Sequence, residues 1–215
     1  MEQQISKLSR SGLIITLTGG IAAGKSFILR HFRKMGYNTL SVDRLAHQCL
    51  ASDVMKAILQ EQFEDCFDKN GALDKKLLSA VVFRDLTRLK KLNNAIHPLI
   101  RAQYEVMIES HIKHQNRSMV IEIPLMVEAM INDDYVYKAH IRFLVTSEYD
   151  TRLKRALLRN GMTREKFNAI TKLQLPDSIK SQHVDFIIHN ENRLSTLNQV
   201  GRFFCGKFKR DSIRY

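Results

Sequence analysis

The amino-acid sequence contains no apolar run long enough to cross a membrane, and its N-terminus, MEQQISKLSR, lacks the apolar segment of a signal peptide. Its cysteines, Cys49, Cys66 and Cys205, are odd in number and far apart, so they indicate neither a disulfide framework nor a metal cluster. The eight histidines show no metal-ligand spacing, and no Ser-His-Asp triad or reactive-cysteine context is evident. These absences predict a cytoplasmic protein with reduced thiols and no membrane partner.

Acidic residues are fewer than basic ones, since 34 lysines and arginines against 22 aspartates and glutamates give a formal net charge of +12. Such an excess fits a nucleic acid, an anionic membrane surface or small phosphate-rich substrates. No zinc-finger spacing, aromatic RNA-binding signature or long basic run is present, so nucleic acid is not expected as the main partner. The basic tail at residues 207–210 keeps that possibility open, although a solvated chain end explains it equally.

One glycine-rich stretch dominates the remaining signals. Residues 19–26 read GGIAAGKS and match the pattern G-x-x-x-x-G-K-[ST] without a gap. An apolar, β-branched run at residues 13–17 precedes the stretch, and Phe27, Ile28, Leu29 and Phe32 follow at helical spacing. Strand, glycine-rich turn and helix in this order are the context of a phosphate-binding loop.

The residue types of this loop suit a nucleotide triphosphate. Backbone N–H groups can surround phosphate oxygens only where glycine lets the chain turn sharply, and the N-terminus of the following helix adds positive potential. Lys25 is expected to reach the β- and γ-phosphates, and the hydroxyl of Ser26 is expected to hold Mg²⁺. The predicted cofactors are therefore ATP and Mg²⁺, and the predicted loop contacts are Gly19, Gly20, Ile21, Ala22, Ala23, Gly24, Lys25 and Ser26.

Five short apolar segments predict strands, at residues 13–18, 37–42, 119–123, 141–146 and 185–188. The first helix is expected to end near Met35, where Gly36 follows, and residues 52–114 contain only helical patterns. Within that stretch Asp74 is expected to cap one helix and Pro98 to open another. Strands that alternate with helices predict an α/β fold with a doubly wound, parallel, five-stranded sheet.

A basic helix is expected at residues 148–160. Ser147 and Asp150 resemble a capping box before it, and Thr163 is expected to cap the helix that follows. Arg155 and Arg159 lie one turn apart on this helix, where they could clamp phosphates from a lid or form a solvated basic face.

Acidic residues fall where parallel strands end, which is the rim at which ligands bind in such sheets. Asp43 follows the second strand and could accept a proton from an attacking hydroxyl or hold Mg²⁺ through water; capping a helix is its alternative role. Glu122 near the end of the third strand could hold metal, but a residue one step before a strand end can face either side.

Several motifs together resemble the dephospho-coenzyme A kinase family. They run in order through nearly the whole chain: LTGGIAAGKS, SVDRLAHQ, GALDKKLLSAVVFRD, NAIHPLI, EIPLMVE, RLKRALLRNGMTRE, Gln174 and VDFIIHN. The phosphate loop alone is shared by many NTPases, whereas the IHPLI and IPLMVE segments are much more specific.

The resemblance implies a P-loop kinase that transfers the γ-phosphate of ATP to the ribose 3′-hydroxyl of dephospho-coenzyme A, the last step of coenzyme A synthesis. It matches Asp43 to the general base and Arg155 and Arg159 to lid arginines, and it brings the segment of Asn190 toward the adenine. The position after Ser26 also contacts nucleotide in the family, and here it is Phe27, which lacks the usual hydroxyl. Ser41 and Val184 are further departures, from an aspartate and an alanine; none predicts inactivity.

The family's three parts divide the chain into expected regions. These are a nucleotide-binding core (residues 1–50, 116–149 and 183–215), a helical coenzyme A domain (51–115) and a lid region (150–182). The alternatives are a P-loop kinase of another small molecule, such as a nucleotide or sugar, and a basic, nucleic-acid-associated P-loop switch. The oligomeric state stays open.

Overall fold

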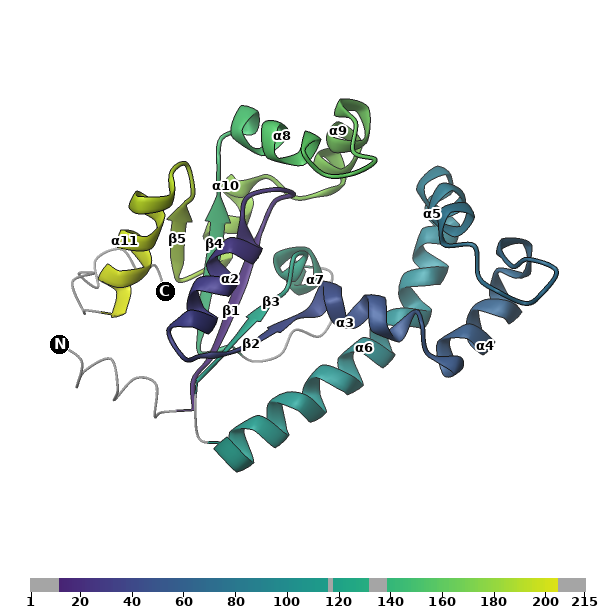
Figure 1. Ribbon diagram of the computed structural model, residues 1–215, viewed down its shortest axis with the longest axis horizontal. Helices are drawn as coiled ribbons and strands as arrows, with labels where there is room; N and C mark the ends of the chain where they lie inside the picture. Colours follow the sequence, from purple (N-terminus) through teal and green to yellow (C-terminus); the bar gives the residue numbers. More distant parts are fainter. Residues whose placement is uncertain (1–11, 116–117, 132–138, 205–215) are drawn as a thin grey trace. The chain divides into compact units, whose positions relative to one another are not determined.

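The computed structural model describes residues 12–115, 118–131 and 139–204 (Figure 1). These residues form two compact units. One comprises residues 12–41 together with the described residues from 109 onward, and the other comprises Val42–Ile108. The predicted polar lead-in at residues 1–11, the basic tail and Cys205 lie outside the described residues.

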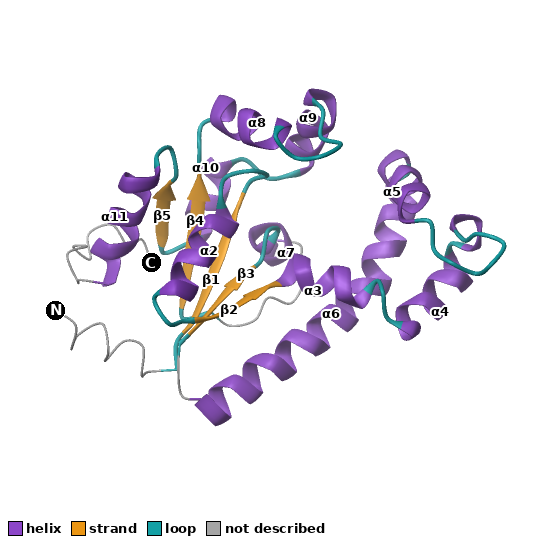
Figure 2. Ribbon diagram, in the orientation of Figure 1, coloured by secondary structure: helices purple, strands orange, loops and turns teal. Residues whose placement is uncertain are grey.

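The first unit is built around a five-stranded, wholly parallel sheet (Figure 2). Its strands are β1 (Ile14–Gly19), β2 (Asn38–Ser41), β3 (Met119–Glu122), β4 (Ile141–Thr146) and β5 (Phe186–His189), in the order β2-β3-β1-β4-β5. The predicted α/β class and five parallel strands are confirmed, with strand ends within two residues of the expected ones. Because the strands are parallel, the turns after β1, β3, β4 and β5 meet at one rim.

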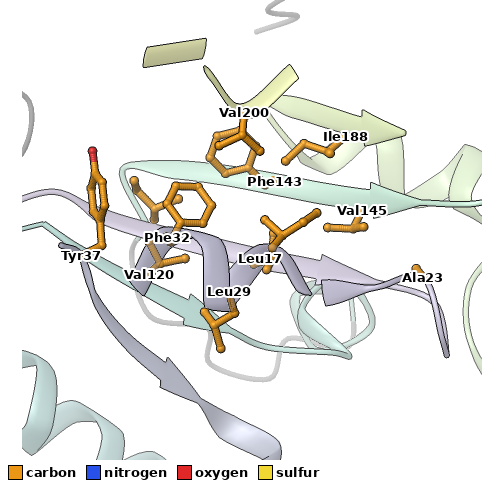
Figure 3. Packing of buried hydrophobic residues seen from close by; sticks show 12 residues of the cluster. Leu17, Ala23, Leu29, Phe32, Tyr37, Val120, Phe143, Val145, Ile188 and Val200 are labelled. Carbon is orange, nitrogen blue, oxygen red and sulfur yellow. The ribbon is translucent and has the colours of Figure 1, made fainter. Parts of the chain in front are cut away.

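The central strands are apolar because both of their faces are covered. All six residues of β1 are buried, which is typical of a strand inside a parallel sheet. On one face, α2 (Lys25–Lys34) and α11 (Arg193–Phe204) pack against the sheet. Figure 3 shows Phe32 of α2, Val200 of α11 and Phe143 of β4 gathered in one buried cluster. Burial of such large side chains contributes about 1.5–3 kcal/mol each.

The remaining helices of the first unit follow β3 and β4. They are α7 (Met126–Ile131), α8 (Tyr149–Leu157), α9 (Arg164–Leu173), α10 (Asp177–Lys180) and the short 3₁₀ turn η2 (Ser181–His183). Thr163 caps α9 as predicted, because its side chain accepts the N–H of Lys166. No helix of the described residues is both long and apolar enough to span a membrane.

The predicted capping box at Ser147 and Asp150 is wrong. Helix α8 begins after Glu148, and neither predicted side chain caps it. Instead the carboxylate of Glu191, from the turn after β5, accepts the N–H of Glu148 at 2.6 Å and the hydroxyl of Thr151 at 2.9 Å. A carboxylate brought in by the sheet therefore replaces the local cap.

The second unit is helical, with α3 (Val42–Cys49), α4 (Asp53–Gln62), the 3₁₀ turn η1 (Glu64–Cys66), α5 (Lys75–Arg84) and the first part of α6 (Leu86–Gln115). Asp74 caps α5 as predicted, since its carboxylate accepts the N–H groups of Lys76 and Leu77.

The prediction that Pro98 opens a new helix is wrong, because α6 runs through it without a break. Proline removes one N–H from the helical ladder and normally disfavours an interior position. Here one buried stripe at four-residue spacing continues on both sides of the proline, so the packed face outweighs the lost hydrogen bond. Its residues are Leu92, Ile96, Ile100, Tyr104 and Ile108.

Candidate functional site

The turn between β1 and α2 has the backbone of a phosphate-binding loop. Its φ angles are +147° at Gly19, +58° at Ala22 and +99° at Gly24, so three residues adopt a left-handed conformation. Successive turns of this kind direct N–H groups inward and form an anion-binding concavity. Helix α2 begins at Lys25 and directs its N-terminal end at the same place.

Three glycines of the loop lie against neighbouring groups that leave no room for a side chain. A Cβ at Gly19 would collide with the backbone oxygen of Val145 in β4. A Cβ at Gly24 would collide with the side-chain amide of Asn190, and one at Gly20 with the guanidinium of Arg152. The close approach of Val145 and Asn190 therefore requires glycine at positions 19 and 24, the two that the motif specifies, whereas the motif leaves position 20 open.

Lys25 and Ser26 differ in exposure. The Nζ of Lys25 donates to the backbone oxygens of Gly19 at 2.8 Å and Gly20 at 3.1 Å, and the residue is 9% exposed. Its ammonium therefore lies within the loop itself. Ser26, in the first turn of α2, is exposed to solvent. This arrangement holds the cation inside the anion site and leaves a hydroxyl accessible at its edge.

Asn190 joins the end of β5 to the loop. Its side-chain N–H donates to the backbone oxygen of Ala23 at 2.7 Å, and its side-chain oxygen accepts from the hydroxyl of Thr196 at 2.9 Å. Asn190 is 4% exposed and Thr196 is fully buried. Sequence reasoning connected this segment with the adenine and missed the direct contact with the loop and the part of Thr196.

Arg155 lies next to Asn190 in the folded chain. Its guanidinium donates to the backbone oxygens of Asn190 at 2.9 Å and Glu191 at 3.4 Å, and to the hydroxyl of Ser147 at 3.2 Å. One Nη lies 3.7 Å from the place where a Cβ of Gly24 would be. The fold thus brings Arg155, Asn190 and the loop together.

Helices α8 and α9 pack directly on the loop. Ala22 belongs to a buried cluster with Leu153, Ala156 and Phe167, and Ile21 packs against it. The Oε1 of Gln174, which follows α9, accepts the N–H of Ile21 at 2.8 Å. Gln174 appeared in the sequence only as a family match, and nothing local indicated this contact.

A buried ion pair fixes the segment after Gln174. The Nζ of Lys180 lies 2.8 Å from the Oε1 of Glu128 in α7, and its side chain is fully buried. The same carboxylate oxygen accepts the N–H of Leu175 at 3.0 Å. Sequence reasoning missed this pair, because a lysine gives no local signal of burial.

The other predicted residues differ in their position and exposure. Asp43 lies in the first turn of α3, in the second unit, and is exposed. Glu122 ends β3, in register with Leu17 and Ser41, and is 5% exposed. Arg159 is exposed beyond the end of α8.

Carboxylates, histidines and cysteines do not assemble into a metal centre anywhere in residues 12–115, 118–131 and 139–204: no group of three or more is positioned to hold an ion. A metal at this site would therefore depend on ligand phosphates and on single side chains such as Ser26.

Comparison with known proteins places this architecture in a family. The model of the dephospho-CoA kinase family matches residues 13–196. A dephospho-CoA kinase of Fusobacterium nucleatum is 31% identical over 194 residues, covering 90% of this chain and 97% of the relative. One of Rhodopseudomonas palustris is 32% identical over 184 residues, covering 84% and 88%.

A solved structure supports the same fold. The protein TT1252 from Thermus thermophilus superposes with a TM-score of 0.77 at 27% identity, covering 92% of this chain and 98% of that one. Because the family model matches residues 13–196 and these two relatives are 31% and 32% identical over most of the chain, the chain belongs to the dephospho-CoA kinase family.

Proposed function

We propose that this protein transfers the γ-phosphate of ATP to the ribose 3′-hydroxyl of dephospho-CoA and so completes coenzyme A synthesis in the cytoplasm. As a member of the family it is an ATP-dependent phosphotransferase. The observation that carries the proposal is the loop at residues 19–26, in which Lys25 lies against the carbonyls of Gly19 and Gly20 at the N-terminus of α2.

The loop supplies the electrostatic part of catalysis. Phosphoryl transfer passes through a transition state with charge on the phosphoryl oxygens, and stabilisation of that charge is the main task of the protein. The N–H groups of the loop other than those of Ile21 and Ala23, which donate to Gln174 and Gly20, would surround the phosphates together with the N-terminal end of α2. The ammonium of Lys25 would move from the loop carbonyls to the β- and γ-oxygens. Phe27 and Asn190 would border the rest of the nucleotide.

Mg²⁺ fits this site through Ser26. Magnesium in kinases is held by phosphate oxygens, waters and one or two protein oxygens, and an exposed hydroxyl in the first turn of α2 suits that role. The ion would supply positive charge that neutralises the phosphate oxygens. Asp43, through water, and Glu122 are the candidate acidic partners of such an ion.

The acceptor would be held by the helical domain at residues 51–115, and Asp43 would take the proton of its 3′-hydroxyl. Residues 150–182 would act as a lid. Arg155 would act through Asn190, to which it donates a hydrogen bond, and Arg159 would bring an exposed positive charge as the lid closes.

The direct test is an ADP-release assay with ATP, Mg²⁺ and dephospho-CoA, run beside nucleoside monophosphates and sugars. We expect turnover only with dephospho-CoA and a product with the mass of coenzyme A. Turnover with another acceptor would retain the kinase chemistry and remove the proposed substrate. Absence of acceptor-dependent turnover in protein that binds ATP would favour the switch alternative.

Replacement of the proposed base tests the role of Asp43. We expect Asp43→Asn to lower kcat by about 100-fold or more, within the usual range for general-base catalysis, and to leave ATP affinity unchanged. Asp53→Asn, at an acidic residue in the first turn of α4, is the matched control. A turnover near that of the control would remove Asp43 from the mechanism.

A further inference from the structure

The guanidinium of Arg152 lies over the phosphate loop. Its Nη1 occupies the space that a Cβ of Gly20 would need, and the Oε1 of Gln174 lies 3.6 Å from the same point. Arg152 comes from α8 and Gln174 from the end of α9, so two distant segments converge above one glycine. Sequence reasoning selected Arg155 and Arg159 and passed over Arg152.

Arg152 also has unused hydrogen-bonding capacity. Its Nε is buried without a hydrogen-bond partner, and its guanidinium has no acidic partner in the part of the chain that the structure describes. A guanidinium carries five N–H donors, and burial without partners is costly. Arg155, in contrast, already donates to Ser147, Asn190 and Glu191.

The surroundings hold Arg152 in place. Its Cζ lies 6.0 Å from the centre of the ring of Phe167, which is fully buried and packs edge-to-face on Tyr149. A guanidinium within about 6 Å of the centre of an aromatic ring is attracted to it, and this attraction restricts its position. Phe167 belongs to the buried cluster that contains Ala22 of the loop, so the ring near Arg152 and the loop are packed together.

The position of Arg152 also indicates which phosphate it would meet. The ammonium of Lys25 lies against the carbonyls of Gly19 and Gly20, and this lysine serves the β- and γ-phosphates. Arg152 contacts the same Gly20. Both cations therefore lie at Gly20, the part of the loop that is expected to face the β- and γ-phosphates.

We propose that Arg152 binds the terminal phosphate of ATP and is a catalytic residue of the transfer, a role that rests on the proposed function. As the bond from phosphorus to the acceptor oxygen forms and the bond to the ADP oxygen breaks, Arg152 stays protonated and donates hydrogen bonds to the transferred phosphoryl oxygens. The proton of the acceptor hydroxyl goes to the base.

The experiment compares Arg152→Gln with Lys154→Gln, which removes an equal charge from an exposed position of the same helix. Calorimetry gives the Kd values of ATP and AMP, and the coupled assay gives kcat and the KM for dephospho-CoA. We expect Arg152→Gln to weaken ATP binding by about 10- to 100-fold, as for a lost charged hydrogen bond, with AMP binding and the KM for dephospho-CoA unchanged. Its kcat should fall by at least about 100-fold. Lys154→Gln should match the wild type.

A conservative variant separates the cation from its packing. Arg152→Lys keeps the charge but loses the planar fork, so ATP affinity and kcat should lie between those of the wild type and Arg152→Gln. If Arg152→Gln does not fold, Arg152→Lys alone should still weaken ATP binding by several-fold and leave AMP binding intact.

Two results would overturn the proposal: equal behaviour of the variants at 152 and 154, or equal weakening of ATP and AMP binding. Failure of the wild type to phosphorylate dephospho-CoA would instead overturn the proposed function, because the comparison of ATP with AMP needs no acceptor.

Discussion

At the scale of single residues, the site depends on glycines at which a side chain would collide with a neighbouring group. Gly24 has a φ of +99°, and the side-chain amide of Asn190 occupies the space that a Cβ of Gly24 would need. The glycine therefore serves two requirements, a left-handed backbone and the approach of the β5 segment. Asn190 reaches the oxygen of Ala23 only because Gly24 leaves this space open.

Gly24→Ala tests that requirement. Strain at a left-handed residue is about 1–3 kcal/mol, and displacement of Asn190 would add the loss of a hydrogen bond of about 1 kcal/mol. We expect ATP affinity to fall more than tenfold and the free energy of unfolding to decrease by about 2 kcal/mol or more, as measured by calorimetry and urea denaturation.

Gly201→Ala is the control for this prediction. Gly201 lies in α11 with open space around its Cα, so alanine there should raise stability by up to about 1 kcal/mol and leave ATP binding unchanged. Equal ATP affinity in the two variants would contradict the steric argument.

At the scale of elements, helix ends depend on distant segments as well as on local sequence. Helices α5 and α9 have caps that lie next to them in the chain, at Asp74 and Thr163. Helix α8 instead receives the carboxylate of Glu191 from the β5–α11 turn. Both Arg152 and Arg155 belong to α8, so the residue at which this helix begins determines where their side chains lie relative to the loop.

The contact between the carboxylate of Glu191 and the start of α8 depends on pH. Partial burial raises the pKa of Glu191, but hydrogen bonds from the Glu148 N–H, Thr151 and Ser147, together with the charge of Arg155, outweigh it and hold the pKa below the ordinary value. Because the pKa of Glu191 is lowered in the folded state, its ionised carboxylate stabilises the fold at pH values above the ordinary glutamate pKa. This stabilisation is lost as pH falls through the folded-state value.

Glu191→Gln should therefore destabilise the protein by about 0.5 kcal/mol at pH 7, which is typical of an exposed charge at a helix N-terminus. The difference in free energy of unfolding between variant and wild type should disappear below the folded-state pKa of Glu191, because both side chains are then neutral. Urea denaturation at several pH values measures it. A difference that does not change with pH would assign Glu191 a role independent of its charge.

At the scale of the whole molecule, segments far apart in the chain are joined beneath the site. Lys180 of α10 is fully buried against Glu128 of α7, and Glu128 also holds Leu175 beside Gln174. The segment that contacts Ile21 of the loop is thus anchored through α7 to the end of β3.

A double-mutant cycle on Lys180 and Glu128 tests this anchor. Removal of one partner leaves a buried charge unpaired, so Lys180→Met and Glu128→Gln should each lower the free energy of unfolding by about 3 kcal/mol or more. The double variant removes both charges and keeps an acceptor for Leu175, so it should be more stable than the sum of the two changes predicts. Urea denaturation gives all four values.

The pair of Arg88 and Asp65, whose closest atoms are 2.6 Å apart, is the control because both side chains are partly exposed, 31% and 53%. Arg88→Gln should have a much smaller effect than Lys180→Met, since water screens exposed charges. Additive effects in the cycle on Lys180 and Glu128 would show that the two buried groups do not stabilise each other.

Much of the fold could be predicted from contiguous residues. The phosphate loop is a local motif, and the five strands are short apolar runs with clear borders, so their existence and parallel direction followed from the pattern. Their order in the sheet comes from the structure alone. The errors have a common origin. At Pro98 and at the start of α8, tertiary packing overrides a local signal: a buried stripe continues the first helix, and Glu191 replaces a local cap.

The sequence by itself determined the class of fold, the loop and its two polar residues, Lys25 and Ser26, because backbone requirements there are encoded within eight neighbouring positions. Only the tertiary structure decided that Arg152 and Gln174 lie over Gly20, that Asn190 bonds to the loop, and that Lys180 is buried. The reason is physical. These contacts join residues 52 to 167 positions apart in the chain, and only the packing of helices on the sheet sets which side chains meet.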